Sequence, residues 1–413
     1  MKTIFCLFIL CLLALSAEAQ DPFKPYLNNA SPVIVRQLDS EVEDHIRLDK
    51  LVFFSNVDAR DATDSTMIFA VVARPKKPGK YPGLLVLHGG GGNAEIDKVK
   101  AWAAKGYVAL SIDEPGIANP EKVPFSSGSW KDIPYGKERF TAQPDVRASV
   151  LFKGAVAAIQ AFYLLQDQPD VIRERIGIVG ISWGGYLTTL VSGFMGEQVY
   201  ASYSVYGSGF YDEGSTFQKQ LNEMNEADRK IWLKYLDAGR RAKGIKNPFF
   251  IAAAANDNWF YPPAVMKTIK TSKGPVNHVF SPNDSHKIQL PGGTSEKDKI
   301  GWTGMEELYF EYYLKGIGKP FPEFGKVSQK IKDEKLMISF NVDGGVINEA
   351  KVFYSISEAT WPKRTWKEAE VVKDGDDYLV SIPLKDGPID WFATISDDRP
   401  VSVSTHVKHI NKN

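Results

Sequence analysis

The chain has 413 residues, in which 50 Lys and Arg are balanced by 50 Asp and Glu, so its formal net charge at pH 7 is zero. This balance argues against nucleic acid or an anionic membrane surface as the main partner. The length predicts two or three domains, or one large α/β domain with an appendage, and 43% hydrophobic residues exclude a disordered chain.

The first nineteen residues, 1–19, are predicted to be a signal peptide. An unbroken apolar run from Ile4 to Leu15 is followed by Ala17-Glu18-Ala19, the small-x-small pattern after which signal peptidase cleaves. This run is too short to cross a bilayer core of about 30 Å, so no membrane anchor is expected. Both cysteines lie within the segment, and the mature chain is therefore expected to be secreted or periplasmic and free of disulfides.

From residue 48 onward, strand-like apolar runs alternate with segments of helical spacing. The predicted strands are at 48–55, 67–74, 83–87, 107–112, 176–179, 199–205, 248–253 and 276–280. The predicted helices are at 95–105, 145–166, 184–194 and 300–314. Alternation of this kind predicts a mostly parallel sheet with helices on both faces.

After residue 318 the pattern changes to short alternating strands separated by Asp/Gly turns, which predicts a small all-β sandwich. These strands are expected at 336–342, 351–357, 366–372, 377–382, 388–395 and 401–407. The predicted domains are therefore a lead-in at 20–47, an α/β domain at 48–325 and a β-sandwich at 326–413. Long insertions at 114–144 and 207–245 are expected to cap the α/β domain, because loops of this length are usually functional.

The sequence Gly180-Ile181-Ser182-Trp183-Gly184 follows one predicted strand and precedes a predicted helix. This is the Gly-x-Ser-x-Gly elbow in its expected context of strand, sharp turn and helix. The start of the helix directs backbone N–H groups towards developing negative charge. We therefore predict that Ser182 is a nucleophile.

A nucleophilic serine needs a general base, and the base needs a carboxylate that orients it. Loops at the carboxyl ends of parallel strands meet at one rim of a sheet. Asp257 follows the strand at 248–253, and His286 follows the strand at 276–280. His286 is the predicted base and Asp257 the predicted acid, with Asp212, which follows the strand at 199–205, as the alternative acid.

The loop after the strand at 83–87 reads His88-Gly89-Gly90-Gly91-Gly92. Glycines allow backbone N–H groups to approach a tetrahedral oxyanion closely. The expected donors are Gly90 and Trp183, with Gly91 as the alternative to Gly90, and His88 is expected to brace the loop. No Gly-Lys-Ser/Thr follows, which disfavours a phosphate loop.

Aromatic residues beside the predicted acid and in the second insertion are expected to contact the substrate: Trp259, Tyr261 and Tyr211. Aromatic rings suit either the faces of sugars or an aromatic acid. No metal site and no cofactor are predicted, because the chain has no His-Glu-x-x-His and no dense group of His and carboxylates.

These motifs resemble the α/β-hydrolase fold over residues 48–318, in which Ser182, Asp257 and His286 follow the usual chain order. Within that fold the chain resembles the acetylxylan esterase and dienelactone hydrolase-like group of bacterial carbohydrate esterases. Two departures stand out. Dienelactone hydrolases proper use a cysteine where this chain has Ser182, and acetylxylan esterases commonly have an aromatic residue where it has Gly90.

The resemblance and the motifs predict a secreted serine carboxylic ester hydrolase that works through an acyl-enzyme. Its substrate is expected to be a small-molecule or glycan ester, most simply an acetylated or acylated polysaccharide or oligosaccharide. One alternative is a serine peptidase of the prolyl oligopeptidase type, which the lack of a long N-terminal propeller disfavours. The other is a non-catalytic glycan-binding protein on a hydrolase scaffold.

Overall fold

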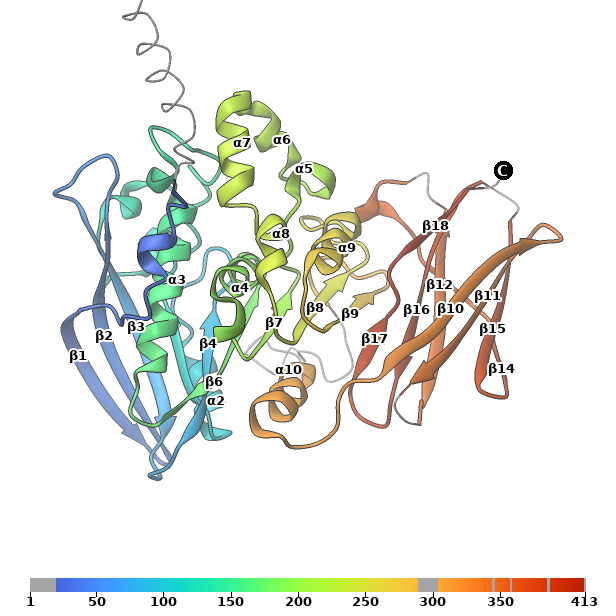
Figure 1. Cartoon of the computed structure of the whole chain (residues 1–413), viewed down its shortest axis with the longest axis horizontal. Coiled ribbons are helices and arrows are strands. Elements are labelled where there is room, and N and C mark those ends of the chain that lie inside the picture. Colours follow the sequence, from blue (N-terminus) through green and yellow to red (C-terminus); the bar gives the residue numbers. More distant parts are fainter. Residues whose placement is uncertain (1–19, 289–303, 344–345, 357–358, 385–386, 412–413) are drawn as a thin grey trace, which may run out of the picture.

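The computed structural model describes residues 20–288, 304–343, 346–356, 359–384 and 387–411. The predicted signal peptide at 1–19 and the start of the helix predicted at 300–314 lie outside the described residues. Figure 1 shows an α/β body followed by an all-β part that contains the C-terminal end of the chain. The predicted fold class, a mostly parallel sheet with helices and a C-terminal all-β domain, is confirmed.

The described strands of the α/β body form one nine-stranded sheet in the order β1-β2-β3-β5-β4-β6-β7-β8-β9. The pairs β1/β2, β2/β3 and β3/β5 are antiparallel, and the pairs from β5 through β4 to β9 are parallel. The strands are β1 (Ile34–Glu43), β2 (Ile46–Val57), β3 (Ser65–Pro75), β4 (Tyr81–Leu87), β5 (Val108–Ile112), β6 (Val171–Ile181), β7 (Ala201–Val205), β8 (Phe249–Ala254) and β9 (Val276–Ser281). Strands β5, β7 and β8 are buried throughout, as expected for parallel strands covered on both faces.

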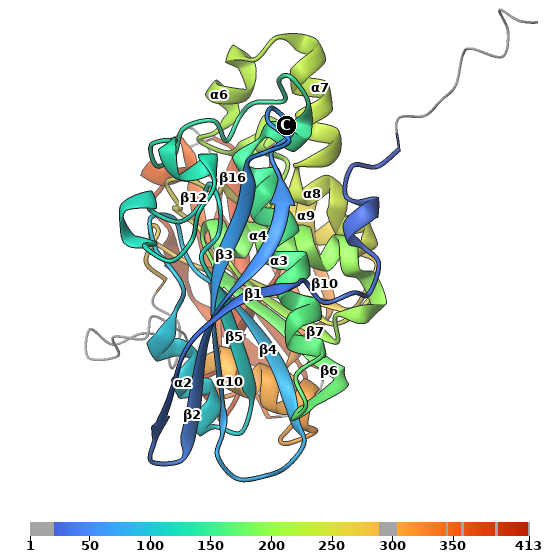
Figure 2. The ribbon, with the colours of Figure 1, turned by 90° about the vertical axis from the view of Figure 1, so that its left-hand side faces the viewer.

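Helices cover both faces of this sheet, as Figure 2 shows for α2 on one side and α3 and α4 on the other. Helix α2 also meets α10, where the rings of Trp102 and Phe310 lie 5.8 Å apart. Helix α3 begins at a Ser149 cap whose hydroxyl accepts a hydrogen bond from the Leu151 amide. The helices are α2 (Ile96–Ala104), α3 (Val150–Gln166), α4 (Trp183–Met195), α5 (Tyr211–Gly214), α6 (Gln218–Glu223), α7 (Glu226–Tyr235), α8 (Ala238–Arg241), α9 (Pro262–Thr271) and α10 (Gly304–Phe310), which continues into one π-helical turn at Glu311–Lys315.

The predicted lead-in at 20–47 contains an additional strand, β1, which the sequence pattern did not indicate. Most of β1 is exposed, so it lacks the apolar alternation of a half-buried strand, and two register irregularities interrupt its pairing with β2. Before it, Phe23 is fully buried, with its ring centroid 4.5 Å from that of Phe152 and 4.2 Å from that of Phe194. This contact fastens the lead-in to α3 and α4.

The C-terminal part consists of two antiparallel sheets, one in the order β10-β11-β15-β14 and the other in the order β13-β12-β16-β17, with β18 paired to β16. The strands are β10 (Glu323–Lys332), β11 (Lys335–Asp343), β12 (Glu349–Ile356), β13 (Lys367–Ala369), β14 (Val371–Asp374), β15 (Asp377–Pro383), β16 (Ile389–Ser396), β17 (Ser402–Ser404) and β18 (Lys408–Ile410). Alternate residues of β11, namely Leu336, Ile338 and Phe340, are buried, as are all residues of β16 except Ser396. This is the pattern of two sheets that enclose a common core.

Two strands expected in this part differ in the structure: one is divided and the other is shorter. The segment 366–372 forms β13, which pairs with β12, and β14, which pairs with β15 in the other sheet. The segment 401–407 contains only the short β17, and β18 follows from Lys408. An alternating pattern shows that a segment is extended, but it does not show which sheet the segment joins, so the prediction of single strands was wrong.

The two parts are in contact along the edge of the nine-stranded sheet at β9. Strand β17 packs beside β9, and the Phe280 amide donates a hydrogen bond of 2.9 Å to the Ser404 hydroxyl. At the other end of β9, the side-chain amide of Asn277 donates to the Pro322 carbonyl at 3.0 Å. In the part of the chain that the structure describes, none of the helices has the length and apolar character needed to cross a membrane.

Candidate active site

Ser182 occupies the sharp turn between β6 and α4. Its backbone has φ +57° and ψ −118°, a strained conformation for a residue other than glycine, and its amide donates to the Val205 carbonyl at 2.9 Å. Gly184 allows this turn to lie against the strand next to it, because a Cβ there would be 2.4 Å from the carbonyl oxygens of Leu87 and His88. The strand, turn and helix that the sequence predicted are all present.

Ser182, His286 and Asp257 form a continuous hydrogen-bonded chain. His286 Nε2 lies 2.8 Å from Ser182 Oγ, and His286 Nδ1 lies 2.8 Å from Asp257 Oδ2. Three different strand ends supply these side chains, namely those of β6, β8 and β9. The structure therefore brings together the three residues that the sequence nominated.

Both oxygens of Asp257 are engaged, and the side chain is fully buried. While Oδ2 faces His286, Oδ1 accepts the backbone N–H groups of Trp259 at 2.6 Å and Phe260 at 3.0 Å. Asp212, the alternative acid, instead forms a two-pronged pair with Arg240 at 3.0 and 2.8 Å. The geometry favours Asp257 as the partner of His286.

Tyr206, which the sequence analysis did not identify, fixes the plane of the His286 ring. The two rings are stacked with centroids 4.2 Å apart and an interplanar angle of 29°. The Tyr206 hydroxyl accepts a hydrogen bond of 2.7 Å from the Ile288 amide, which ties it to the chain just after His286. The only available signal was its place directly after β7, and that place does not reveal a partner.

In the loop after β4, the Gly90 amide remains available to a ligand, whereas the amides of Gly91 and Gly92 do not. The Gly91 amide donates to the Ile117 carbonyl at 2.8 Å, and the Gly92 amide donates to the Gly89 carbonyl at 3.1 Å. No hydrogen bond of the Gly90 amide is found among the described residues. Trp183 is the first residue of α4, so its amide has no acceptor within the helix. The geometry favours the donor pair Gly90 and Trp183 over the alternative with Gly91.

His88 braces this loop from below, as predicted. The His88 amide donates to Glu114 Oε1 at 2.6 Å, and the Glu114 amide donates to His88 Nε2 at 3.2 Å. Because Nε2 accepts, Nδ1 carries the proton and donates to the Gly89 carbonyl at 2.8 Å. Burial lowers the pKa of His88 to about 4 and raises that of the Glu114 carboxyl well above its usual value. The His88 ring is therefore neutral at pH 7, and burial favours the protonated form of the Glu114 carboxyl.

The insertion at 114–144 reaches the oxyanion loop through Tyr135 and Arg139. The Tyr135 hydroxyl fills the space beside Gly90, where an added Cβ would be 2.2 Å from its oxygen. The Arg139 guanidinium lies between two rings, 4.5 Å from the centroids of both Tyr135 and Trp183, and its Nε donates to the Gly116 carbonyl at 2.7 Å. Burial lowers the pKa of Arg139. The sequence analysis noted Tyr135 only as one of several aromatic residues in the insertion.

The three aromatic residues expected to contact the substrate differ in exposure. Trp259 is 47% exposed and stacks in parallel on Phe217, with centroids 5.9 Å apart. Tyr261 is partly exposed at the start of α9. Tyr211 is fully buried against Trp183 and Phe217, so the structure contradicts its predicted contact with substrate. The aromatic composition of the insertion did not reveal which rings face inwards.

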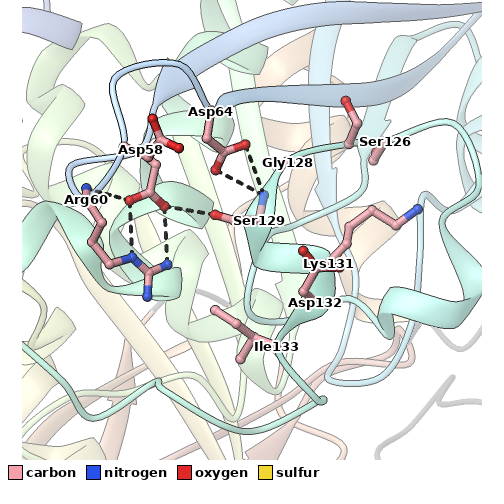
Figure 3. A pocket seen from close by; sticks show the side chains of 11 residues that line it. Asp58, Arg60, Asp64, Ser126, Gly128, Ser129, Lys131, Asp132 and Ile133 are labelled. Atoms are coloured by element: carbon pink, nitrogen blue, oxygen red, sulfur yellow. Dashed lines mark hydrogen bonds and ion pairs between the residues drawn. The ribbon is translucent and has the colours of Figure 1, made fainter.

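A separate polar hollow of 770 Å³ lies between the turn that joins β2 to β3 and residues 126–133 (Figure 3). Its deepest carboxylate, Asp58, pairs with Arg60 and with the buried Lys153, and Asp64 accepts the Ser129 amide at 3.1 Å. The residues that line it do not include Ser182, Asp257 or His286. Across the described residues, no three His, Cys, Asp or Glu side chains are arranged so that they could hold a metal ion.

Two curated proteins illustrate the sequence relatives of this chain. The acetyl esterase Axe7A of Xylanibacter ruminicola is 24% identical over 234 residues, which cover 53% of this chain and 52% of the relative. The uncharacterized peptidase YtmA of Bacillus subtilis is 28% identical over 179 residues, which cover 43% of this chain and 56% of the relative. The chain thus spans about half the length of the curated relatives it matches.

Solved structures with the same fold include two acetyl xylan esterases. Acetyl xylan esterase 1 from Thermoanaerobacterium sp. JW/SL YS485 superposes with a TM-score of 0.54 at 18% identity, covering 72% of this chain and 94% of that protein. The acetyl xylan esterase from Paenibacillus sp. R4 gives a TM-score of 0.54 at 19% identity, covering 70% of this chain and 92% of that protein. These likenesses confirm the α/β-hydrolase fold. The model of the dienelactone hydrolase family matches residues 68–281, more than half of the chain, and the protein therefore belongs to the dienelactone hydrolase family.

Proposed function

We propose that the protein is a serine carboxylic ester hydrolase that acts through an acyl-enzyme. The observation that carries the proposal is the hydrogen-bonded chain from Ser182 through His286 to Asp257, with 2.8 Å at each step. A nucleophile, a base and an orienting carboxylate in this order are the parts that acyl transfer requires. Membership of a hydrolase family is consistent with this assignment.

In the acylation step, His286 Nε2 accepts the proton of Ser182 Oγ while that oxygen attacks the ester carbonyl. Negative charge develops on the carbonyl oxygen, and the amides of Gly90 and Trp183 donate hydrogen bonds to it. The tetrahedral intermediate collapses when the bond to the alcohol breaks, and His286 transfers its proton to the departing oxygen. Asp257 stabilises the imidazolium that exists between the two proton transfers.

In the deacylation step, water attacks the acyl carbon while His286 Nε2 accepts one of its protons. The bond between the acyl carbon and Ser182 Oγ then breaks, and Oγ recovers a proton from His286 as the carboxylic acid leaves. The stacked Tyr206 ring, 4.2 Å from the His286 ring, keeps the imidazole in one plane through both steps. Neither step requires a group from outside the chain other than the ester and water.

We further propose that the ester is an acetyl or similar acyl group on a polysaccharide or oligosaccharide. Trp259 supports this class of substrate, because its half-exposed indole, two residues after Asp257, offers a flat apolar face to a sugar ring. Both acetyl xylan esterases and the acetyl esterase Axe7A are named for acetyl esters. A glycan substrate also agrees with export through the predicted signal peptide, which we propose on the basis of the sequence alone.

Reaction with a fluorophosphonate probe tests the proposed chemistry directly, because the probe phosphonylates a serine that a neighbouring base activates. We expect intact-mass spectrometry to show one adduct on the wild-type chain and none on Ser182→Ala. Acetate released from acetylated xylan and from an aryl acetate would then identify the acyl group. A well-folded wild-type protein that forms no adduct would refute the proposed function and favour the non-catalytic glycan-binding alternative.

The peptidase alternative is tested with the same protein preparation. One curated relative, YtmA, carries the name of an uncharacterized peptidase, and a peptidase would use the same three side chains. Release of an amine from peptide p-nitroanilides at a rate comparable to ester hydrolysis would support that alternative. We expect ester hydrolysis to exceed it by several orders of magnitude.

A further inference from the structure

The two loops that carry Asp257 and His286 are both held by one segment of the C-terminal domain, residues 359–366. The loops already contact each other, since the backbone N–H of Asn256 donates to the Asp284 carbonyl at 3.1 Å. In each loop an asparagine within three residues of the catalytic residue extends its side chain across the domain boundary. These residues are Asn256 and Asn283, and the sequence analysis assigned neither of them a role in the site.

Asn256 directly precedes Asp257, and its side chain is 94% buried, with 6% exposed. Its side-chain amide donates to two carbonyl oxygens of the C-terminal domain, that of Arg364 at 2.6 Å and that of Trp361 at 3.3 Å. A rotation of the loop that carries Asp257 would break both hydrogen bonds at a buried position. Because Asn256 and Asp257 share one peptide bond, the contacts of Asn256 couple the position of Asp257 to the C-terminal domain.

Asn283 lies three residues before His286 and uses both ends of its side-chain amide. Its Nδ2 donates to the Trp366 carbonyl at 2.9 Å, and its Oδ1 accepts the Trp366 amide at 2.8 Å. The Asn283 side chain thus makes the same pair of hydrogen bonds to the Trp366 backbone that a residue in a neighbouring β-strand would make. Asn283 has a left-handed backbone, with φ +57°, which asparagine tolerates better than most residues.

The segment that receives these contacts is itself anchored in the β-domain core. The Arg364 guanidinium forms a buried ion pair with Asp390 of β16 and lies over the Trp361 ring, 3.5 Å from its centroid. The Trp366 ring, 3% exposed, packs edge-on against Phe392 with centroids 4.8 Å apart. The segment that accepts the hydrogen bonds of Asn256 and Asn283 is therefore held firmly in the C-terminal domain.

We propose that Asn256 and Asn283 are positioning residues. Through them the C-terminal domain holds the Asp257 loop and the His286 loop at the separation that the hydrogen bonds between Ser182, His286 and Asp257 require. The inference depends on the proposed function, because it assigns these residues a role in the same reaction. It also gives the β-domain a part in catalysis that needs no glycan binding. A displacement of about 1 Å in such a site can lower the rate by about a hundredfold.

The test compares three full-length variants with the wild type. Asn256→Ala removes the contacts of the acid loop, and Asn283→Gly removes those of the base loop while it keeps a residue that tolerates positive φ. Asn277→Ala is the matched control. It removes the 3.0 Å bond from Asn277 to the carbonyl of Pro322, the residue directly before β10, about 13 Å along β9 from Ser281.

The readouts are kcat and KM for an aryl acetate, the rate of fluorophosphonate labelling, and the melting temperature. We expect Asn256→Ala and Asn283→Gly to lower kcat and the labelling rate by about 10- to 100-fold with KM changed less than threefold. We expect Asn277→Ala to shift the melting temperature similarly and to keep wild-type kcat. All labelling rates are measured at one temperature, about 20 °C below the lowest of the melting temperatures, so that every variant is folded and unfolding does not imitate the effect.

Two results would overturn the inference. One is wild-type kcat in both Asn256→Ala and Asn283→Gly, and the other is an equal loss of kcat in all three variants, which would indicate general loosening of the boundary. Both results differ from failure of the proposed function, in which the wild-type chain itself neither labels nor hydrolyses the ester.

Discussion

Replacing Asp257 by Asn changes the protonation of the base while it leaves the shape of the site intact. Oδ1 of Asp257 accepts two backbone N–H groups, from Trp259 at 2.6 Å and from Phe260 at 3.0 Å. The carbonyl oxygen of an asparagine would keep that position, so its NH₂ group would face His286 Nδ1 at about the present 2.8 Å. Nδ1 must then accept a hydrogen bond, which moves the imidazole proton to Nε2.

An Nε2–H directed at Ser182 Oγ leaves no base for the serine proton. The same change of tautomer in other serine hydrolases lowers turnover by about 10⁴-fold, which corresponds to about 5 kcal/mol in the activation barrier. We expect a loss of that size in kcat/KM for an aryl acetate with Asp257→Asn, and unchanged melting within a few degrees. Asp212→Asn is the control, because its carboxylate pairs with Arg240 at 2.8 Å and lies outside the hydrogen-bonded chain. The reasoning is refuted if Asp257→Asn keeps more than a tenth of wild-type activity, or if Asp212→Asn loses as much.

Three further predictions concern Gly90 of the oxyanion loop, the buried Asp113 carboxyl directly after β5, and the exposed Trp259. Gly90→Ala would place a methyl group 2.2 Å from the Tyr135 hydroxyl oxygen. We therefore expect kcat to fall at least about 100-fold in a chain that still folds. A loss of kcat under tenfold would contradict the role of the Gly90 amide as an oxyanion donor. Burial raises the pKa of Asp113 to about 6, so the folded state binds this proton more tightly than the unfolded state does. The free energy of unfolding should therefore fall as pH rises from about 4 to 6, by up to about 3 kcal/mol from this group, and urea titrations of Asp113→Asn at pH 5 and pH 8 should show a smaller difference than the wild type. Trp259→Ala should raise KM for acetylated oligosaccharides by about tenfold and leave hydrolysis of an aryl acetate within twofold, because the ring stacked on Phe217 offers its free face to a sugar; equal effects on both substrates would argue against a sugar contact.

The sequence was sufficient to predict which three side chains meet, because each of them follows a strongly apolar strand. Ser182, Asp257 and His286 stand at the ends of β6, β8 and β9, and the parallel sheet brings those ends to one rim. The choice between Asp257 and Asp212 remained open for a physical reason. Both acids follow a strand, and they are distinguished only by their partners in the folded chain, which are His286 for Asp257 and Arg240 for Asp212.

The elements that were missed share a different property, which is that their role depends on a partner far away in the chain. Strand β1 is mostly exposed and has no apolar period of its own. Asn283 pairs with Trp366, 83 residues later, and neither residue carries a local sign of that contact. Tyr211 and Trp259 are both aromatic residues in polar segments, and the sequence does not show which of them is buried. In the structure Tyr211 is fully buried and Trp259 is 47% exposed. Tyr211 is buried because the insertion folds back onto Trp183.

The nine-stranded sheet ends in two edges, and an uncovered edge can recruit a strand from another molecule. At β9 this risk is reduced by β17, and the Phe280 amide, which could pair with a foreign strand, is already bonded to Ser404. At β1 the protection has another form, since two register irregularities and the exposed Asp39 and Glu43 make the edge a poor template. A proteolytic cut between the two parts would therefore leave Ser182, Asp257 and His286 in the same fragment but expose β9, and we expect that fragment to be lost to strand-mediated aggregation.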